Sequence, residues 1–385
     1  MAYSARKLGE VADLFVKLGS ISFGGPAAHI ALMEQETVVR RQWLSREHFL
    51  DLLATTNLVP GPNAVEMAGH IGFVRAGWPG LIVGGVAFIL PAFVISLVLA
   101  WVYSRLGALP QVTALFYGIN PAVIAIILAA TYRLGRTALE DWRFLVLGIL
   151  CLAAALLGAD EVSVLLAAGA AGVALSAVER HGPWQMTALL SCWGPLVGVL
   201  AAPASWLDDR LVRLGLFFLK VGALIFGSGM VLFAFIQRDV VERFGWLTQQ
   251  QLLDAIAVGQ MTPGPVLSSA TFIGYLVAGV PGATVATVAV FLPAFLIIAL
   301  VGPWIPRLRR SPWVQSFLRG VNAAVVALIL AVAVSLFRAA VVDVWTAAIF
   351  LAGLVLLIRL RLDTLWLVVG GAACGVIHYL VLGAG

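Results

Sequence analysis

Residues 15–25 read F-V-K-L-G-S-I-S-F-G-G, and residues 218–227 read F-L-K-V-G-A-L-I-F-G, so one pattern returns after 203 residues. A second pair has the same spacing, because Pro60-Gly61-Pro62 returns as Pro263-Gly264-Pro265. Glycine and proline interrupt helices, and both the glycine motifs and the Pro-Gly-Pro motifs lie within apolar sequence, where we call them breaks. At membrane depth such breaks are tolerated only where the backbone is buried in protein or lines a cavity. Duplicated breaks therefore predict a binding site built by both halves of a membrane carrier.

The composition indicates a membrane protein with many helices. Of 385 residues, 62% are hydrophobic and only 11% are charged. Apolar runs long enough to cross a bilayer recur along the chain, and we expect an all-α polytopic protein embedded in lipid. The net charge of +5 is scattered over short loops, which favours a topological bias and excludes nucleic acid as a partner. The cysteines lack metal-ligand spacing, so we expect no metal or cofactor.

The hydropathy pattern predicts about 13 membrane segments, grouped as two repeats around a linker helix. We place the first repeat at 1–183, the linker helix at 184–204 and the second repeat at 205–385. The first two segments of each repeat carry the breaks, so they are either broken helices or re-entrant hairpins. The segments are 11–33, 48–74, 80–103, 111–132, 143–158, 160–178, 186–203, 208–235, 249–276, 281–304, 315–337, 342–358 and 362–383.

The linker segment predicts the relative orientation of the repeats. Six segments per repeat is an even number, so one additional crossing at 186–203 inserts the second repeat upside down. The same holds if the broken segments are re-entrant. Most Lys and Arg residues then fall on the N-terminal side, which predicts a cytoplasmic N-terminus and a periplasmic C-terminus.

The repeat extends far beyond the two opening motifs. Further pairs include Asp51 with Asp254 and Asn120 with Asn322. The spacing changes from 203 to 202 residues after one deletion, and both values recur at many aligned glycines and prolines. This regularity indicates an internal duplication.

Lys17 and Lys220 are candidate anion-binding residues. A lysine within an apolar segment is costly and usually faces a cavity or a partner. Two of them at inverted positions would meet near the middle of the membrane and attract an anion. The alternative is that each ammonium reaches the membrane surface along its flexible side chain.

The glycine breaks are candidate oxyanion sites. Glycine lets a ligand approach the backbone closely, and a half-helix that starts at a break offers free N–H groups and a positive dipole end. The alternative is that the breaks only allow close helix packing. The predicted substrate-binding residues are Lys17, Gly24, Gly25, Pro26, His29, Pro60, Gly61, Pro62, Asn63, Lys220, Gly227, Ser228, Gly229, Pro263, Gly264 and Pro265.

Four polar residues are candidates for ion coupling. His29 and Glu66 have no counterpart in the other repeat, and either is a candidate proton carrier, although a satisfied structural role is the more frequent explanation. For Asp51 and Asp254, we favour pairing with a nearby Arg or Lys over substrate binding.

Two asparagines, Asn120 and Asn322, also occupy equivalent positions in the repeats. For these we slightly favour hydrogen bonds across helices over donation to an anion.

The chain resembles the chromate ion transporter family in its long, two-repeat form. The motifs that carry the resemblance are Ser22-Phe23-Gly24-Gly25-Pro26, Ala28-His29-Ile30, Arg41 through Trp43-Leu44, Pro60-Gly61-Pro62, Phe88 through Leu90-Pro91, and Pro263-Gly264-Pro265. The resemblance implies a bacterial inner-membrane carrier that exports chromate and confers chromate resistance. Sulfate, another tetrahedral dianion, is the natural look-alike. The second repeat departs from the pattern, because it reads Phe226-Gly227-Ser228-Gly229 without the proline.

Other functions remain open to different degrees. Sulfate uptake or exchange, or proton-coupled movement of another anion, fits the same residues. An intramembrane enzyme would need a convergent nucleophile, base and orienting group, and the scattered histidines supply none. The energetics favour export, because a dianion leaving a negative-inside cell gains roughly 4.6 kcal/mol per 100 mV. Oligomeric state is not readable from residues, and a homodimer is one open assembly.

Overall fold

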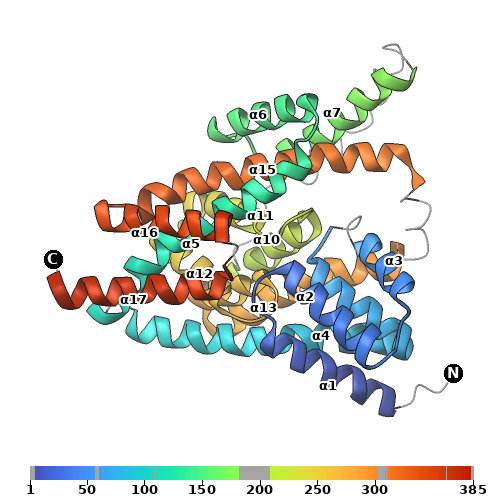
Figure 1. The fold of residues 1–385 in the computed structure, drawn as a ribbon, viewed down its shortest axis with the longest axis horizontal. Coiled ribbons are helices and arrows are strands. Elements are labelled where there is room, and N and C mark those ends of the chain that lie inside the picture. The colour runs from blue at the N-terminus through green and yellow to red at the C-terminus, as the bar shows by residue number, and fades with distance from the viewer. Residues whose placement is uncertain are drawn as a thin grey trace.

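The computed structural model describes residues 5–56, 60–107, 109–181, 209–301, 308, 310–360 and 362–382, and it contains α-helices joined by short turns. Figure 1 shows these helices packed into one bundle with the two chain ends on opposite sides. No strand occurs in these residues, so the all-α class is confirmed. The predicted linker helix at 184–204 lies outside the described residues.

The helices of the two repeats follow the same order. The first repeat has α1 (Ala5–Ile21), α2 (Pro26–Glu34), η1 (Gln35–Arg40), α3 (Arg46–Thr56), α4 (Asn63–Leu106), α5 (Pro110–Ala138), α6 (Trp142–Leu156) and α7 (Glu161–His181). The second has α10 (Arg210–Leu224), α11 (Val231–Phe235), η3 (Ile236–Arg243), α12 (Gln249–Met261), η4 (Val266–Ser268), α13 (Ser269–Val301), α15 (Pro312–Ala340), α16 (Val344–Val355), η6 (Leu356–Leu360) and α17 (Thr364–Leu382).

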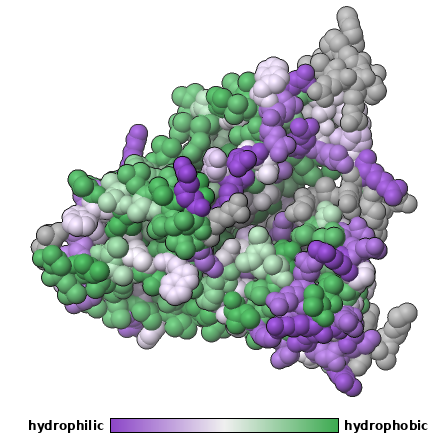
Figure 2. Space-filling model, in the orientation of Figure 1, coloured by the Kyte–Doolittle hydropathy of each residue, from purple (hydrophilic) through white to green (hydrophobic). Residues whose placement is uncertain are grey.

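Apolar helices dominate the surface of the protein. Within the described residues, five stretches are long and apolar enough to cross a membrane. Hydrophobic side chains cover much of the visible face, while hydrophilic ones gather towards the end that carries α1 and α3 (Figure 2). The five stretches are Asn63–Leu106, Pro110–Ala138, Val266–Leu300, Pro312–Ala340 and Thr364–Val381.

Two of these long stretches are helical hairpins. In α4 the backbone leaves the helical region at Ala76 and Gly77, and Gly77 has a φ of 65°. A Cβ atom on Gly84 would touch the carbonyl oxygen of Ala68. In a straight helix these two residues would be separated by about four turns, or about 24 Å. The chain must therefore reverse its direction. α13 repeats this turn at Ala278 and Gly279.

The glycine breaks near the start of each repeat also reverse the chain. The side chain of Lys17 in α1 bonds Glu36 in η1, and Lys220 in α10 bonds Asp239 in η3. Each pair is separated by 19 residues, which is too far for contact within a straight helix. The segments predicted at 11–33 and 208–235 are thus hairpins whose turns lie at the breaks.

The two repeats are packed into each other. A Cβ on Gly118 of α5 would overlap the carbonyl oxygen of Gly371 of α17. The equivalent contact joins Gly320 of α15 to Ala168 of α7. Each of these interfaces pairs one helix from each repeat, and the small residues allow the helix backbones to touch. The bundle is therefore shared between both repeats.

Candidate functional site

The first glycine break starts a new helix with an exposed N-terminal end. Gly24 and Gly25 have φ values of 96° and 84°, which L side chains rarely adopt. Pro26 is the first residue of α2, where its missing N–H costs nothing, and no side chain caps the helix. In the second repeat Gly227 also has a positive φ, of 66°. The local sequence alone is thus enough to produce both breaks.

The Pro-Gly-Pro turns bind the glycine breaks of the opposite repeat. The N–H of Gly61 donates to the carbonyl of Ile225 at 2.7 Å, and the N–H of Gly264 donates to the carbonyl of Ser22 at 2.8 Å. Ser22 and Ile225 are equivalent positions, and each lies two residues before its glycine break. This reciprocal pair brings all four breaks to one place in the protein.

A small cavity lies between these four breaks. Its volume is about 90 Å³, compared with roughly 10–15 Å³ for a single water measured in the same way. It therefore has room for a small ion. Both repeats contribute to its wall, and His29 has the one titratable side chain among the described residues that line it. The lining residues are Pro26, His29, Gly61, Pro62, Asn63, Ala64, Gly227, Ser228, Gly229, Met230, Pro265, Val266 and Leu267.

Four helical segments begin at this cavity. α2 starts at Pro26, α4 starts at Asn63, η4 starts at Val266, and the segment that begins α11 follows the lining residue Met230. The N-terminal end of a helix has unpaired N–H groups and about half a positive charge. Several such ends around one cavity would favour a negative ion there without a charged side chain. The arrangement is suited to an anion.

Lys17 and Lys220 lie next to carboxylates instead of lining this cavity. Lys17 bonds Glu36 at 3.0 Å, and Lys220 bonds Asp239 at 2.7 Å. The hydrogen bond from Lys17 holds the pKa of Glu36 below its ordinary value. Arg40 and Arg41 also pair with Glu36. In this structure each lysine therefore joins the two arms of a hairpin.

His29 and Glu66 are both buried beside the cavity. One ring nitrogen of His29 lies 3.2 Å from the carbonyl of Ser22, and the other has no partner within the described part of the chain. Glu66 is fully buried, and neither of its carboxyl oxygens has a hydrogen-bond partner among the described residues. Its carboxyl group packs directly against Gly61, where a Cβ would overlap it. A carboxyl group thus lies immediately behind the cavity wall.

Among the residues that the structure describes, Asp254 pairs with no Arg or Lys, so the pairing that we expected for this residue was wrong. It accepts hydrogen bonds from Tyr103 at 2.7 Å, Asn120 at 3.0 Å and Gln250 at 2.9 Å. The physical reason is burial, since Asp254 of α12 is packed against α4 and α5, and its three donors are neutral groups of these helices. The bond from Asn120 confirms the hydrogen bond across helices that we expected there. Asp51, the equivalent aspartate, is exposed.

Sequence reasoning missed Tyr103 and Gln250 as partners of Asp254. Tyr103 is 151 residues away from Asp254, and no local pattern indicates the contact. It also missed Met230, Val266 and Leu267 in the cavity wall. The one signal for these three residues was their position just after a duplicated break. Their side chains gave no indication, because residues at a helix N-terminus bind an anion through their backbone N–H groups.

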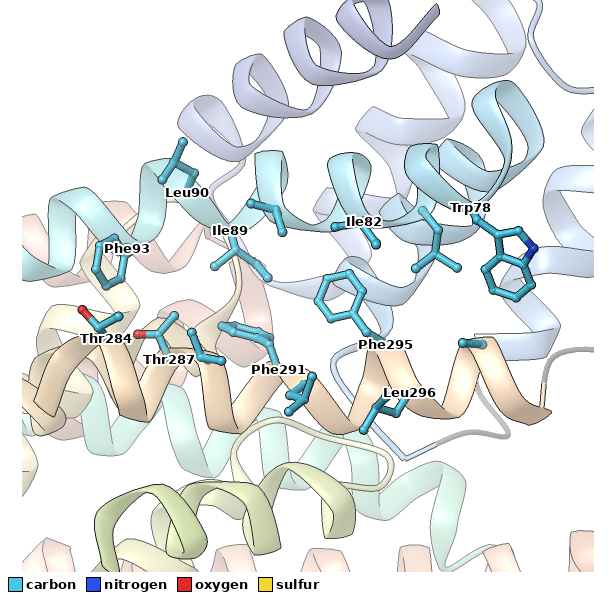
Figure 3. A pocket seen from close by; sticks show the side chains of 15 residues that line it. Trp78, Ile82, Ile89, Leu90, Phe93, Thr284, Thr287, Phe291, Phe295 and Leu296 are labelled. Carbon is cyan, nitrogen blue, oxygen red and sulfur yellow. The ribbon is translucent and has the colours of Figure 1, made fainter. Parts of the chain in front are cut away.

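A larger groove of about 560 Å³ lies between α4 and α13. Figure 3 shows Ile82, Ile89 and Phe93 of α4 facing Phe291 and Phe295 of α13 across it. Of the described residues that line it, Thr284 and Thr287 alone carry a hydroxyl group. Such walls suit hydrocarbon and not a small anion, so the groove is not a candidate oxyanion site.

Comparisons with known proteins agree with the duplicated architecture. The family described as "Chromate transporter" matches residues 9–173 and again residues 212–376. The chain is 37% identical over 361 residues to a "Probable chromate transport protein" of Synechococcus elongatus, covering 93% of this chain and 90% of that protein. It is 34% identical over 374 residues to a "Chromate transport protein" of Cupriavidus metallidurans, covering 96% and 92%.

A "Chromate transport protein" of Pseudomonas aeruginosa is 34% identical over 330 residues, which cover 84% of this chain and 79% of that protein. No solved structure matches. The family matches cover both repeats, and the relatives match most of the chain. The protein therefore belongs to the chromate transporter family.

Proposed function

We propose that this protein is a secondary carrier that exports chromate across the bacterial inner membrane and thereby confers chromate resistance. The observation that carries the proposal is the cavity at which four helical segments begin. A tetrahedral dianion accepts hydrogen bonds on every side, and converging helix N-termini supply donors and positive potential from several directions. The relatives named for chromate transport support chromate as the substrate.

The cavity residues act in this proposal as the direct anion contacts. His29, Asn63 and Ser228 provide polar side-chain groups, and the glycines let the anion approach the backbone. Pro60, Pro263 and Gly264 shape the turns that hold the breaks together. Lys17 and Lys220 act indirectly, by fixing the hairpins through Glu36 and Asp239.

The proposed topology is an inverted repeat with about 13 segments, a cytoplasmic N-terminus and a periplasmic C-terminus. The reciprocal bonds of Gly61 and Gly264 support a two-fold relation between the repeats. Most Lys and Arg residues lie on the N-terminal side of this topology, as the positive-inside rule requires. The membrane potential then drives the dianion outward without a coupled cation.

Uptake of radiolabelled chromate into everted membrane vesicles tests the transport function. Everted vesicles turn cellular export into uptake. We expect accumulation that depends on an imposed membrane potential and falls when excess sulfate is added. Accumulation no greater than that of empty vesicles would reject chromate export. Sulfate uptake or exchange is the second candidate, because sulfate is also a tetrahedral dianion, and direct sulfate accumulation would favour it.

The Gly229→Val variant tests the location of the site. Gly229 lines the cavity, and a side chain there would project towards Leu267 and occupy anion space. We expect chromate uptake to fall at least tenfold while the amount of protein in the membrane is unchanged. Gly9→Val is the control, because nothing lies within 4 Å of its Cβ position. Equal uptake by the two variants would place the site elsewhere.

A further inference from the structure

The two repeats differ in how deeply their equivalent helices are buried. α12 has an unbroken buried run from Leu252 to Gly259, whereas its equivalent α3 buries only Phe49 and Thr56. Leu50 is 49% exposed, whereas the equivalent Leu253 is 0% exposed. The two helices occupy equivalent places in the repeats and share the Leu-Asp pair at 50–51 and 253–254, but α3 begins with charged residues where α12 has three glutamines.

The hairpins that precede these helices show the same difference. All five residues of α11 are buried, but the equivalent α2 buries only His29 and Met33. In Figure 1, α3 lies at the margin of the molecule, whereas α12 lies among α5, α13 and α17. The second-repeat hairpins are therefore docked into the bundle, and the first-repeat hairpins are displaced outward from it.

Two equivalent asparagines contact the docked hairpins. Asn120 of α5 donates to Asp254 of α12 at 3.0 Å. Asn322 of α15 lies against the glycine break, because its side-chain oxygen is 2.7 Å from the place that a Cβ of Gly227 would occupy. One asparagine thus holds the aspartate of the second repeat, and the other holds its glycine break.

We infer that Asn120 and Asn322 exchange partners in a second state, in which the first-repeat hairpins dock and the second-repeat hairpins move outward. In that state Asn322 contacts Asp51, and Asn120 contacts the break at Gly24. The inference follows from the duplication. If the two repeats exchange their conformations, the observed contact of Asn120 with Asp254 becomes a contact of Asn322 with Asp51. The observed contact of Asn322 with the break at Gly227 becomes a contact of Asn120 with the break at Gly24. It rests on the proposed carrier function, where exchange would open the cavity alternately to the two membrane faces.

The sequence indicates why the observed state is the more stable one. Asp254 accepts from three neutral donors, Tyr103, Asn120 and Gln250. The position equivalent to Tyr103 is Ile305, which has no hydroxyl group, and the position equivalent to Gln250 is Glu47. Docked Asp51 would thus have fewer donors and an acidic neighbour one turn away on α3. Removing the Tyr103 hydroxyl should therefore favour the second state.

Disulfide trapping tests the exchange without any substrate. Cys151, Cys192 and Cys374 are first replaced by serine. The pair Asn120→Cys with Asp254→Cys should cross-link rapidly, because it reports the observed state. The pair Asp51→Cys with Asn322→Cys should also cross-link, and at least three times faster when Tyr103→Phe is added. Tyr132→Phe is the matched control, because Tyr132 is 52% exposed on α5, and it should leave the rate unchanged.

The pair Asp51→Cys with Asn120→Cys is the geometric control, since neither state brings these residues together. Absence of the 51–322 cross-link beside an efficient 120–254 cross-link would overturn the inference. So would equal rates for the 51–322 and 51–120 pairs, because these would reflect random motion. A single Leu253→Cys variant gives a second measurement, whose maleimide labelling should rise with Tyr103→Phe. If the cysteine pairs cross-link as expected but the unmodified protein does not move chromate, the proposed substrate is rejected and the exchange is left intact.

Discussion

At the scale of single residues, the proposed site consists of backbone groups and of neutral side chains. No lysine or arginine is among the described residues that line the cavity, and Lys17 and Lys220 are each bound to an acid. A dianion bound by N–H groups avoids a strong ion pair and can leave again. This arrangement agrees with a carrier, which must release its substrate on the far side of the membrane.

Lys220→Met should destabilise the protein more than Lys17→Met. Without Lys17, Glu36 keeps both Arg40 and Arg41, whereas without Lys220 the buried Asp239 keeps only Arg243 among its described ion pairs. We expect a loss of about 1–3 kcal/mol for Lys220→Met and less than about 1 kcal/mol for the half-exposed Lys17. Thermal unfolding in detergent measures both. A larger loss for Lys17→Met would contradict this account.

Glu66→Gln tests whether the buried carboxyl group couples proton movement to transport. Glu66 has no hydrogen-bond partner in the part of the chain that the structure describes, and it packs against Gly61 at the cavity wall. An intramembrane acid in such a position is by default a candidate functional group. If it carries a proton, the glutamine variant should fold normally, but chromate flux should no longer respond to an imposed pH gradient. Glu140→Gln, at an exposed position, is the control. An unchanged response would assign Glu66 a purely structural role.

At the scale of elements, the hairpins depend on glycine pairs that let two helix backbones touch. A Cβ on Gly72 would overlap the carbonyl oxygen of Gly80, and Gly274 meets Gly282 in the same way. The turns between them use Gly77 and Gly279 at positive φ. Because contact and turn both require glycine, these hairpins tolerate little variation.

Gly72→Ala should therefore destabilise the protein by about 2–3 kcal/mol, since overpacking a tight contact forces the backbone to shift. Gly9→Ala is the matched control. It lies in α1 with open space around its Cβ position, so we expect it to be neutral or to stabilise by up to about 1 kcal/mol. Thermal unfolding in detergent measures both variants. Similar unfolding temperatures for the two would show that the two arms of α4 are not in contact.

At the scale of the whole molecule, the repeats are not independent domains. α5 packs on α17 and α7 packs on α15, and each of these interfaces joins one repeat to the other. The bonds of Gly61 and Gly264 cross between the repeats as well. Each half alone would expose helix surfaces that have no partner.

Expression of residues 1–204 and 205–385 as separate chains tests this dependence. We expect each chain alone to be degraded or to aggregate, whereas together they should co-purify from the membrane. The intact protein, expressed at the same level, is the control. Stable, folded material from either half alone would contradict the shared bundle.

The sequence by itself determined the helical class, the duplication and the position of every break. These features arise from local causes, because glycine and proline change the backbone wherever they stand and apolar runs of sufficient length form helices in lipid. The glycine and Pro-Gly-Pro motifs thus led to most residues of the cavity wall. They could not reveal how the four breaks meet.

Only the tertiary structure decided the partners of the charged and polar groups. Lys17 and Lys220 were expected to face an anion, yet they bind Glu36 and Asp239, because a reversed chain brings those acids to them. Asp254 and Asp51 are equivalent positions of the two repeats, but one is buried beside Tyr103 and the other is exposed. The two lysines meet acids 19 residues away across a chain reversal, and Asp254 meets Tyr103 and Asn120 more than a hundred positions away. Periodicity along the chain encodes neither kind of contact.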